Sequence, residues 1–214
     1  MKCKYITIER EYGSGGTAIG RLLSERTGIS CYGREILEEV AKEKQITVEQ
    51  MERYEENATN SFLYSVYMMT QAVSGKTDML TNEGHIYVAE QSVIRRFAAG
   101  GPAIFLGHCA SEALKESDGV VNVFIRCTDE EARRRRIMEE YGIPGTQADI
   151  VRRKFDRKRA NYYYANTVKK WDDFRNYDMV LDSGRLGIDA CVNILQALTA
   201  SGGLSASRND FRFS

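Results

Sequence analysis

The chain has 214 residues, of which 43% are hydrophobic and 28% are charged, a composition typical of a soluble globular protein. Thirty basic and 30 acidic residues give zero net charge. This balance argues against a dedicated DNA-binding protein and against a protein drawn to membranes by its overall charge, and no apolar run approaches the roughly 20 residues of a membrane span.

Short apolar runs predict the strands of a sheet. Four such runs lie at 5–8, 103–106, 120–125 and 179–181, and a fifth short strand is expected at 30–32. The runs show little alternation and are separated by long helical patterns, which is typical of a parallel sheet buried on both faces. The sequence therefore predicts an α/β fold.

Apolar residues at helical spacing predict helices at about 19–23, 36–41, 88–98, 129–140, 148–164 and 188–198. A long stretch from 48 to 73 is expected to form two helices. Its run of Tyr and Met at 64–69 favours helix packing, with an acceptor pocket or a homodimer contact as alternatives. We expect one domain over 1–200, with its core at 1–32, 99–128 and 176–200, a helical insertion at 33–98 and a basic, lid-like region at 129–175. Residues 201–214 are expected to form a flexible tail.

A glycine-rich turn follows the first predicted strand. The sequence from Arg10 to Thr17 reads R-E-Y-G-S-G-G-T and leads into an amphipathic helix. A strand, a glycine-rich turn and a helix together cradle phosphate, because backbone N–H groups and the positive helix N-terminus face the oxyanion. Against the P-loop pattern G-x-x-x-x-G-K-[ST], Thr17 stands at the Mg²⁺-binding hydroxyl, Gly16 stands in place of the lysine and Arg10 in place of the first glycine.

The missing lysine leaves two interpretations open. Arg10 is the cation nearest in sequence that could substitute for it, in which case the protein transfers phosphoryl groups. Otherwise the protein binds nucleotide and transfers poorly, as a sensor or regulatory protein would. A turn that merely joins strand to helix is the structural alternative.

Basic residues are concentrated in the second half of the chain. Residues 133–170 contain twelve basic and four acidic residues, whereas 35–60 contain eight acidic and three basic ones. Four successive arginines, 133–136, point around a helix about 100° apart, so only one or two can face a nucleotide. Thr128 is expected to cap this helix, with Glu131 completing a capping box.

A second basic cluster places Arg152, Asp156 and Arg159 on one helix face, at i, i+4 and i+7. A carboxylate between two arginines would hold two guanidiniums in place, which suits a transferring phosphoryl group. A solvated, salt-bridged helix is the alternative. RNA binding, suggested by the neighbouring Tyr162–Tyr164 run, is disfavoured by the neutral overall charge.

The cysteines and histidines exclude some kinds of site. Five widely spaced cysteines without C-x-x-C argue against a disulfide framework or zinc site and favour a reducing cytoplasm. Two histidines, His85 and His108, are too few for a histidine-based metal cluster, so a metal would be a hard ion held by oxygen ligands.

Taken in order along the chain, these motifs resemble the cytidylate kinase-like family of P-loop proteins. The motifs that carry the resemblance are R-E-Y-G-S-G-G at 10–16, G-H-C-A at 107–110, R-A-N-Y-Y at 159–163, K-W at 170–171 and N-Y-D at 176–178. The similarity extends from about residue 4 to about 198.

The resemblance implies a three-layer, nucleoside monophosphate kinase-like P-loop fold with a central parallel sheet, a helical insertion and a lid. It also implies ATP and Mg²⁺ as cofactors and a small nucleotide, CMP or dCMP or a similar acceptor, as substrate. By the same resemblance, ATP would contact the site residues Gly13, Ser14, Gly15, Gly16, Thr17, Arg133, Arg136, Ser183 and Arg185.

The resemblance implies that Arg152 and Arg159 close on the phosphates and that Arg34 and His108 lie near the acceptor. Relatives commonly have Gly-Arg where this chain has Gly107-His108, and that arginine is expected to grip the acceptor phosphate. The sequence thus predicts an ATP-dependent phosphotransferase with Arg10 and Asp156 supporting transfer, and no partner among membranes or nucleic acids.

Overall fold

Five parallel strands form the central sheet of the computed structural model, which describes residues 3–47 and 82–200. The strands are β1 (Tyr5–Arg10), β2 (Ser30–Tyr32), β3 (Ala103–Leu106), β4 (Val120–Arg126) and β5 (Met179–Asp182), in the order β2-β3-β1-β4-β5. In register, Ile8 of β1 lies opposite Leu106 of β3 and Val123 of β4. The predicted strands are confirmed, and β1 continues two residues further than expected, to Arg10.

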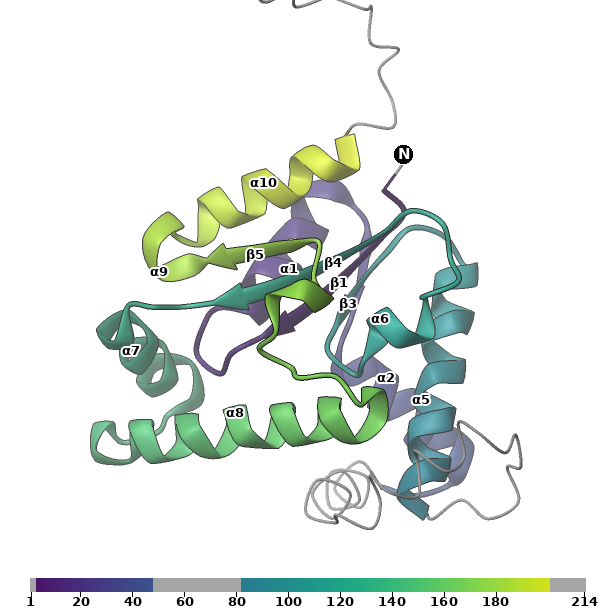
Figure 1. The fold of residues 1–214 in the computed structure, drawn as a ribbon, viewed down its shortest axis with the longest axis horizontal. Coiled ribbons are helices and arrows are strands. Elements are labelled where there is room, and N and C mark those ends of the chain that lie inside the picture. Colours follow the sequence, from purple (N-terminus) through teal and green to yellow (C-terminus); the bar gives the residue numbers. More distant parts are fainter. Residues whose placement is uncertain (1–2, 48–81, 201–214) are drawn as a thin grey trace, which may run out of the picture.

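Helices cover both faces of the sheet, as Figure 1 shows. On one face α1 (Gly16–Thr27) packs beside α10 (Ile188–Ala200), and their apolar residues share a core with Ile6 and Ile8 of β1. On the other face α2 (Arg34–Lys44), α5 (Asn82–Ala99) and α6 (Ala110–Ala113) surround Phe105 of β3. The three-layer α/β prediction is therefore correct.

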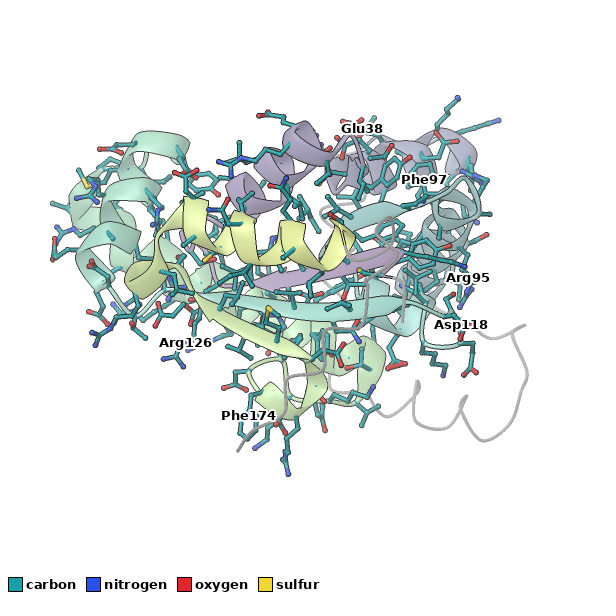
Figure 2. All side chains as sticks on the ribbon, turned by 90° about the horizontal axis from the view of Figure 1, so that it is seen from above. Glu38, Arg95, Phe97, Asp118, Arg126 and Phe174 are labelled. Atoms are coloured by element: carbon teal, nitrogen blue, oxygen red, sulfur yellow. The ribbon has the colours of Figure 1, made fainter. Side chains whose placement is uncertain are left out.

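Two further helices lie at the carboxyl end of the sheet. They are α7 (Glu130–Tyr141) and α8 (Gly145–Thr167), and the arrowheads of β1 and β4 point towards them in Figure 1. Figure 2 marks the two ends of β4 by Asp118, which precedes it, and Arg126, its last residue. Since ligands of open α/β sheets bind outside the carboxyl ends of the strands, the site is expected between β1, β3 and this helix pair.

The alternation of β1 places polar groups inside the protein. Thr7 and Glu9 face away from Ile6 and Ile8, and both are buried. The Thr7 hydroxyl donates a 2.8 Å hydrogen bond to Asn122 Oδ1 of β4. Glu9 Oε2 accepts a 3.2 Å bond from the Trp171 indole, which packs edge-on against Phe124.

The ends of several elements differ from the prediction. The cap of α7 is Asp129, whose carboxylate accepts from the Ala132 N–H, so the capping box predicted at Thr128 is wrong. Thr128 instead donates its hydroxyl to Asp182 at the end of β5. The short helices α6, α9 (Ser183–Leu186) and η1 (Phe174–Asn176) carried no sequence signal strong enough to predict. Phe174 of η1 projects away from the sheet (Figure 2).

Some predictions fall outside the described residues: the helices expected at 48–73, the Tyr and Met run at 64–69, and the tail at 201–214. All five cysteines are described and all are free thiols. No helix among the described residues is both long and apolar enough to cross a membrane.

Candidate functional site

The glycine-rich turn is formed by residues whose backbone conformation and packing exclude side chains. Gly13 and Gly15 adopt left-handed φ angles of 75° and 76°. A Cβ atom on Gly15 would lie 2.4 Å from Ile188, and one on Gly13 would lie 2.7 Å from Ile137. Only glycine fits both demands, and the turn ends directly in the N-terminus of α1, where Thr17 is the second residue.

Buried hydrogen bonds hold the turn in place. The Ser183 hydroxyl donates a 2.6 Å bond to Ser14 O, and the Gly16 N–H donates to the Ser14 hydroxyl. Ser14 itself is fully buried. The Glu11 N–H continues the sheet by donating to Ile125 O at 3.0 Å. Residues from β4 and α9 and the turn's own backbone therefore hold the turn in place.

Arg133 is the buried anchor of this turn. Its side chain is 4% exposed, and its Nε donates a 2.6 Å bond to Tyr12 O. Its other nitrogens pair with the carboxylates of Asp156 and Glu11. Burial is the main cause that raises the pKa of Glu11, and Arg133 opposes this shift. Arg133 thus stabilises the turn through buried contacts with its first residues, Glu11 and Tyr12.

The remaining successive arginines separate into different roles. Arg136 Nη1 lies 3.4 Å from Gly13 O and from the Ser183 hydroxyl, so this side chain runs along the turn. Arg134 donates to Gly145 O, and Arg135 is exposed. Arg133 and Arg136 are thus the two of the four arginines that contact the turn, and their expected role at a nucleotide stays a prediction.

Tyr12 links the turn to α7 and α8. Its ring stacks on Phe155 at 4.5 Å and on Tyr141 at 4.7 Å between centroids. Its N–H donates a 2.7 Å bond to Asp156 Oδ1, and the Arg159 guanidinium lies 5.4 Å above its ring. The helix pair is therefore packed directly onto the glycine-rich turn.

Asp156 holds different partners from those predicted. Its carboxylate binds Tyr12 and Arg133 rather than fixing Arg152 and Arg159 between them. Arg152 turns to other acids, with Nε 3.6 Å from Asp149 and Nη1 3.9 Å from Glu130. Helix spacing correctly put these residues on one face, but it could not show that Arg133, 23 positions earlier, competes for the same carboxylate.

Arg10 occupies the space that a side chain at position 16 would need. A Cβ atom on Gly16 would lie 2.5 Å from Arg10 Cβ and 2.8 Å from its Cγ. The far end of Arg10 reaches Gly107 after β3, where a Cβ would lie 2.3 Å from Nη1. The guanidinium thus lies at the carboxyl ends of β1 and β3, beside the glycine-rich turn.

Arg10 and Arg159 bring two positive charges together. Arg159 Nη1 donates a 2.8 Å bond to Arg10 O. Burial first, and the nearby Arg10 second, lower the pKa of Arg159 to about 10. Burial also lowers the pKa of Arg10, with Glu9 opposing the shift. Among the described residues nothing accepts a hydrogen bond from the buried Arg10 Nε. An anion placed here would relieve both the repulsion and the missing bond.

The chain is similar to known proteins over most of its length. The sequence model of the cytidylate kinase-like family matches residues 5–185. The chain belongs to the cytidylate kinase-like family. It is 27% identical to a cytidylate kinase from Methanococcus vannielii over 197 residues, which cover 89% of this chain and 97% of that protein. It is 24% identical to a cytidylate kinase from Archaeoglobus fulgidus over 194 residues, covering 89% of this chain and 91% of that protein.

A solved structure has the same fold. An uncharacterized protein from Eubacterium ventriosum superposes with a TM-score of 0.68 at 24% identity, covering 92% of this chain and 98% of that one. The family model confirms the family resemblance predicted from the sequence, and this structure confirms the α/β fold.

Between α5, α8 and the residues that follow β3 lies a buried carboxyl group that sequence reasoning missed. Glu90 of α5 is fully buried and accepts a hydrogen bond from the Tyr162 hydroxyl of α8. His108 Nδ1 lies 3.7 Å from the same oxygen, Glu90 Oε2. His108 has a left-handed φ of 57°, and Gln91 donates to its carbonyl. Glu90 gave no signal because its burial depends on residues far along the chain.

Other predicted site residues lie at the periphery. Arg34 is exposed at the start of α2, with Nε 3.3 Å from Glu38. Arg185 is exposed in α9, whereas the adjacent Ser183 is buried against the turn. The described residues contain no group of three or more acidic, histidine or cysteine side chains suited to a metal. Thr17, half-buried in the first turn of α1, offers a hydroxyl next to the glycine-rich turn that could serve one.

Proposed function

We propose that this protein transfers a phosphoryl group from ATP to a nucleoside monophosphate of the CMP or dCMP type, or to a similar small acceptor. The observation that carries the proposal is the position of Arg10 beside the glycine-rich turn, in the space next to Gly16. A cation at this place can neutralise the phosphates in the way that the P-loop lysine does in related enzymes. Membership of the cytidylate kinase-like family supports the nucleotide as substrate.

Binding of ATP phosphates would use the backbone and the fixed arginines. The N–H groups of residues 13–17 and the positive end of α1 favour a polyphosphate. Arg136 runs along the same turn, while Ser183 and Arg185 would lie on the adenine side. Because Arg133, Asp156 and Ser183 hold the turn in position, the donors need little rearrangement on binding.

The cofactor fits the donor set of the turn. Mg²⁺ prefers oxygen ligands and retains several waters, so the Thr17 hydroxyl together with phosphate oxygens would hold it, and the ion would neutralise phosphate charge. Because phosphate oxygens and water supply the other ligands, Mg²⁺ needs no cluster of acidic side chains here.

Transfer would then depend on positioning and charge. Arg10, at the end of β1, and Arg159, inside α8, would bind the transferring group, and Arg152 would approach from the same helix. In-line transfer between phosphate oxygens needs no strong general base, because an acceptor phosphate is already ionised. Arg34 and His108 would lie on the acceptor side.

The free thiols are consistent with the reducing cytoplasm that we propose as the compartment.

The test is an acceptor panel. Purified protein is incubated with Mg·ATP and CMP, dCMP, UMP, AMP, GMP or no acceptor, and ADP and phosphorylated product are measured. We expect transfer to one pyrimidine nucleotide well above the control without acceptor. Absence of transfer to every nucleotide, in protein shown to be folded, would overturn the proposal and leave a nucleotide-binding sensor as the remaining interpretation.

A further inference from the structure

The carboxyl group of Glu90 has one oxygen that the described residues leave without a partner. Glu90 is 0% exposed. Its Oε2 accepts from Tyr162, but no donor among the described residues lies within hydrogen-bonding distance of Oε1. A buried acceptor without a donor is costly, by an amount comparable to a lost hydrogen bond, so native proteins rarely retain one without a reason.

This carboxyl group lies beside the phosphate-binding residues rather than in an unrelated part of the core. His108, which approaches Glu90, directly follows Gly107, and Gly107 touches the Arg10 guanidinium. Tyr162, which donates to Glu90, lies one helical turn after Arg159 on α8. Elements α5, β3 and α8 thus bring Glu90 to the acceptor side of the two arginines.

The chemistry of the group limits what it can bind. A carboxyl oxygen accepts a hydrogen bond, and a carboxylate repels phosphate. The family resemblance implies an arginine where this chain has His108, so the cation expected to grip the acceptor phosphate is replaced by a side chain that lies against Glu90. This corner of the site therefore suits the part of an acceptor that is uncharged and carries N–H or O–H donors.

We propose that Glu90 is a specificity-determining residue whose Oε1 accepts a hydrogen bond from an uncharged N–H or O–H donor of the acceptor nucleoside, and that Tyr162 positions it. In a cytidine nucleotide we assign this donor to either the exocyclic amine of the base or the ribose 2′-hydroxyl. The inference rests on the proposed function for the identity of the acceptor. A site built around a buried acceptor discriminates strongly against analogues without the donor, because their binding leaves the acceptor unpaired.

The test compares the wild type with Glu90→Gln, which keeps the shape of the side chain but offers an N–H₂ group in place of one oxygen. Dissociation constants for CMP, dCMP and UMP are measured by titration calorimetry, and transfer to each is measured in parallel. Glu112→Gln is the matched control, because Glu112 is a partly buried glutamate of α6 that pairs with Lys169. Thermal unfolding and ATP binding report on the fold and on the donor site.

If the donor is the exocyclic amine, Glu90→Gln lowers the preference for CMP over UMP by at least about tenfold. If the donor is the 2′-hydroxyl, Glu90→Gln instead lowers the preference for CMP over dCMP by at least about tenfold. In both cases ATP binding is unchanged and Glu112→Gln behaves as the wild type. Should Glu90→Gln fail to fold, Tyr162→Phe is expected to weaken the same preference in the same direction.

Two results would overturn the inference. In the first, a folded Glu90→Gln or Tyr162→Phe variant shows the same preference among CMP, dCMP and UMP as the wild type. The other is absence of nucleotide acceptor binding to the wild type. The proposed function fails separately: a wild type that binds CMP selectively through Glu90 but transfers nothing would retain the inference and refute the kinase.

Discussion

Replacement of Gly16 by alanine tests how closely Arg10 fills the space beside the glycine-rich turn. The new Cβ would lie 2.5 Å from Arg10 Cβ, 2.8 Å from its Cγ and 3.3 Å from Ile125 Cβ. The Cβ of Arg10 is fixed by the backbone of β1, so rotation of the side chain does not remove the clash. Such overpacking costs about 1–3 kcal/mol. The higher helix propensity of alanine recovers about 1 kcal/mol, so the net loss for Gly16→Ala alone is small.

A double-mutant cycle separates these terms. Arg10→Gly removes both clashing atoms, and the helix propensity gained by Gly16→Ala is the same with or without Arg10. The free energies of unfolding in urea should therefore give an interaction of about 1–3 kcal/mol between the two substitutions. Gly145→Ala, at the start of α8, is the control and should combine with Arg10→Gly additively within about 0.5 kcal/mol. Additive behaviour of Gly16→Ala and Arg10→Gly would refute the placement of the Arg10 side chain.

The remaining stability predictions concern two arginines. Arg133→Met leaves the carboxylates of Asp156 and Glu11 without their buried cation, so it should lower the free energy of unfolding by about 3–5 kcal/mol, whereas the exposed Arg135→Met should change it by less than about 0.5 kcal/mol. An equal effect of both in urea titrations would contradict the anchoring role. Folding lowers the pKa of Arg159 from the ordinary value of an arginine to about 10, so the unfolded chain holds this proton more firmly and the charge opposes folding at every pH below about 10, by roughly 3 kcal/mol. This cost falls only as the pH rises above about 10. Removing Arg159 also removes its hydrogen bond to Arg10 O, which offsets about 1 kcal/mol of the stability gained. At pH 8, Arg159→Met should therefore still stabilise the ligand-free protein. Inorganic pyrophosphate stabilises the wild type by binding to it, and the variant should lose most of that stabilisation. A destabilised variant that keeps the full pyrophosphate effect would show that Arg159 faces no anion.

The fold could be predicted because its signals are local. The strands at 103–106 and 120–125 are continuous apolar runs, as expected of strands buried on both faces, and the structure places β3 and β4 there. The glycines of the turn were recognisable since Gly13 and Gly15 need left-handed φ angles that other residues rarely adopt.

The contacts of the site could not be predicted to the same extent, because their partners are distant in sequence. Helix geometry limited how many of the four arginines can face one ligand, but the pairing of Arg133 with Tyr12 joins residues 121 positions apart. Asp156 was expected to hold Arg152 and Arg159, yet it binds Tyr12 and Arg133, which only the packing of α7 and α8 on the turn brings within reach.

The burial of Glu90 could not be predicted from the sequence either. Glu90 is one of many charged residues in the predicted helices, and its neighbours in sequence do not distinguish it from the exposed Glu38. Its burial follows from Tyr162, 72 positions later, and from His108 after β3. Similarly, Thr128 lost its expected capping role because Asp182 of β5 takes its hydroxyl.

The central claim is that Arg10 supplies the charge that Gly16 cannot. Steady-state kinetics of Arg10→Met with Mg·ATP and the preferred acceptor test it most directly. Arg96→Met is the control, since Arg96 forms ion pairs with Glu39 and Glu43 on α2. We predict that Arg10→Met lowers kcat by about 10²–10³-fold in folded protein, while Arg96→Met leaves kcat within twofold or so. Unchanged turnover in Arg10→Met would remove Arg10 from the mechanism and contradict the account.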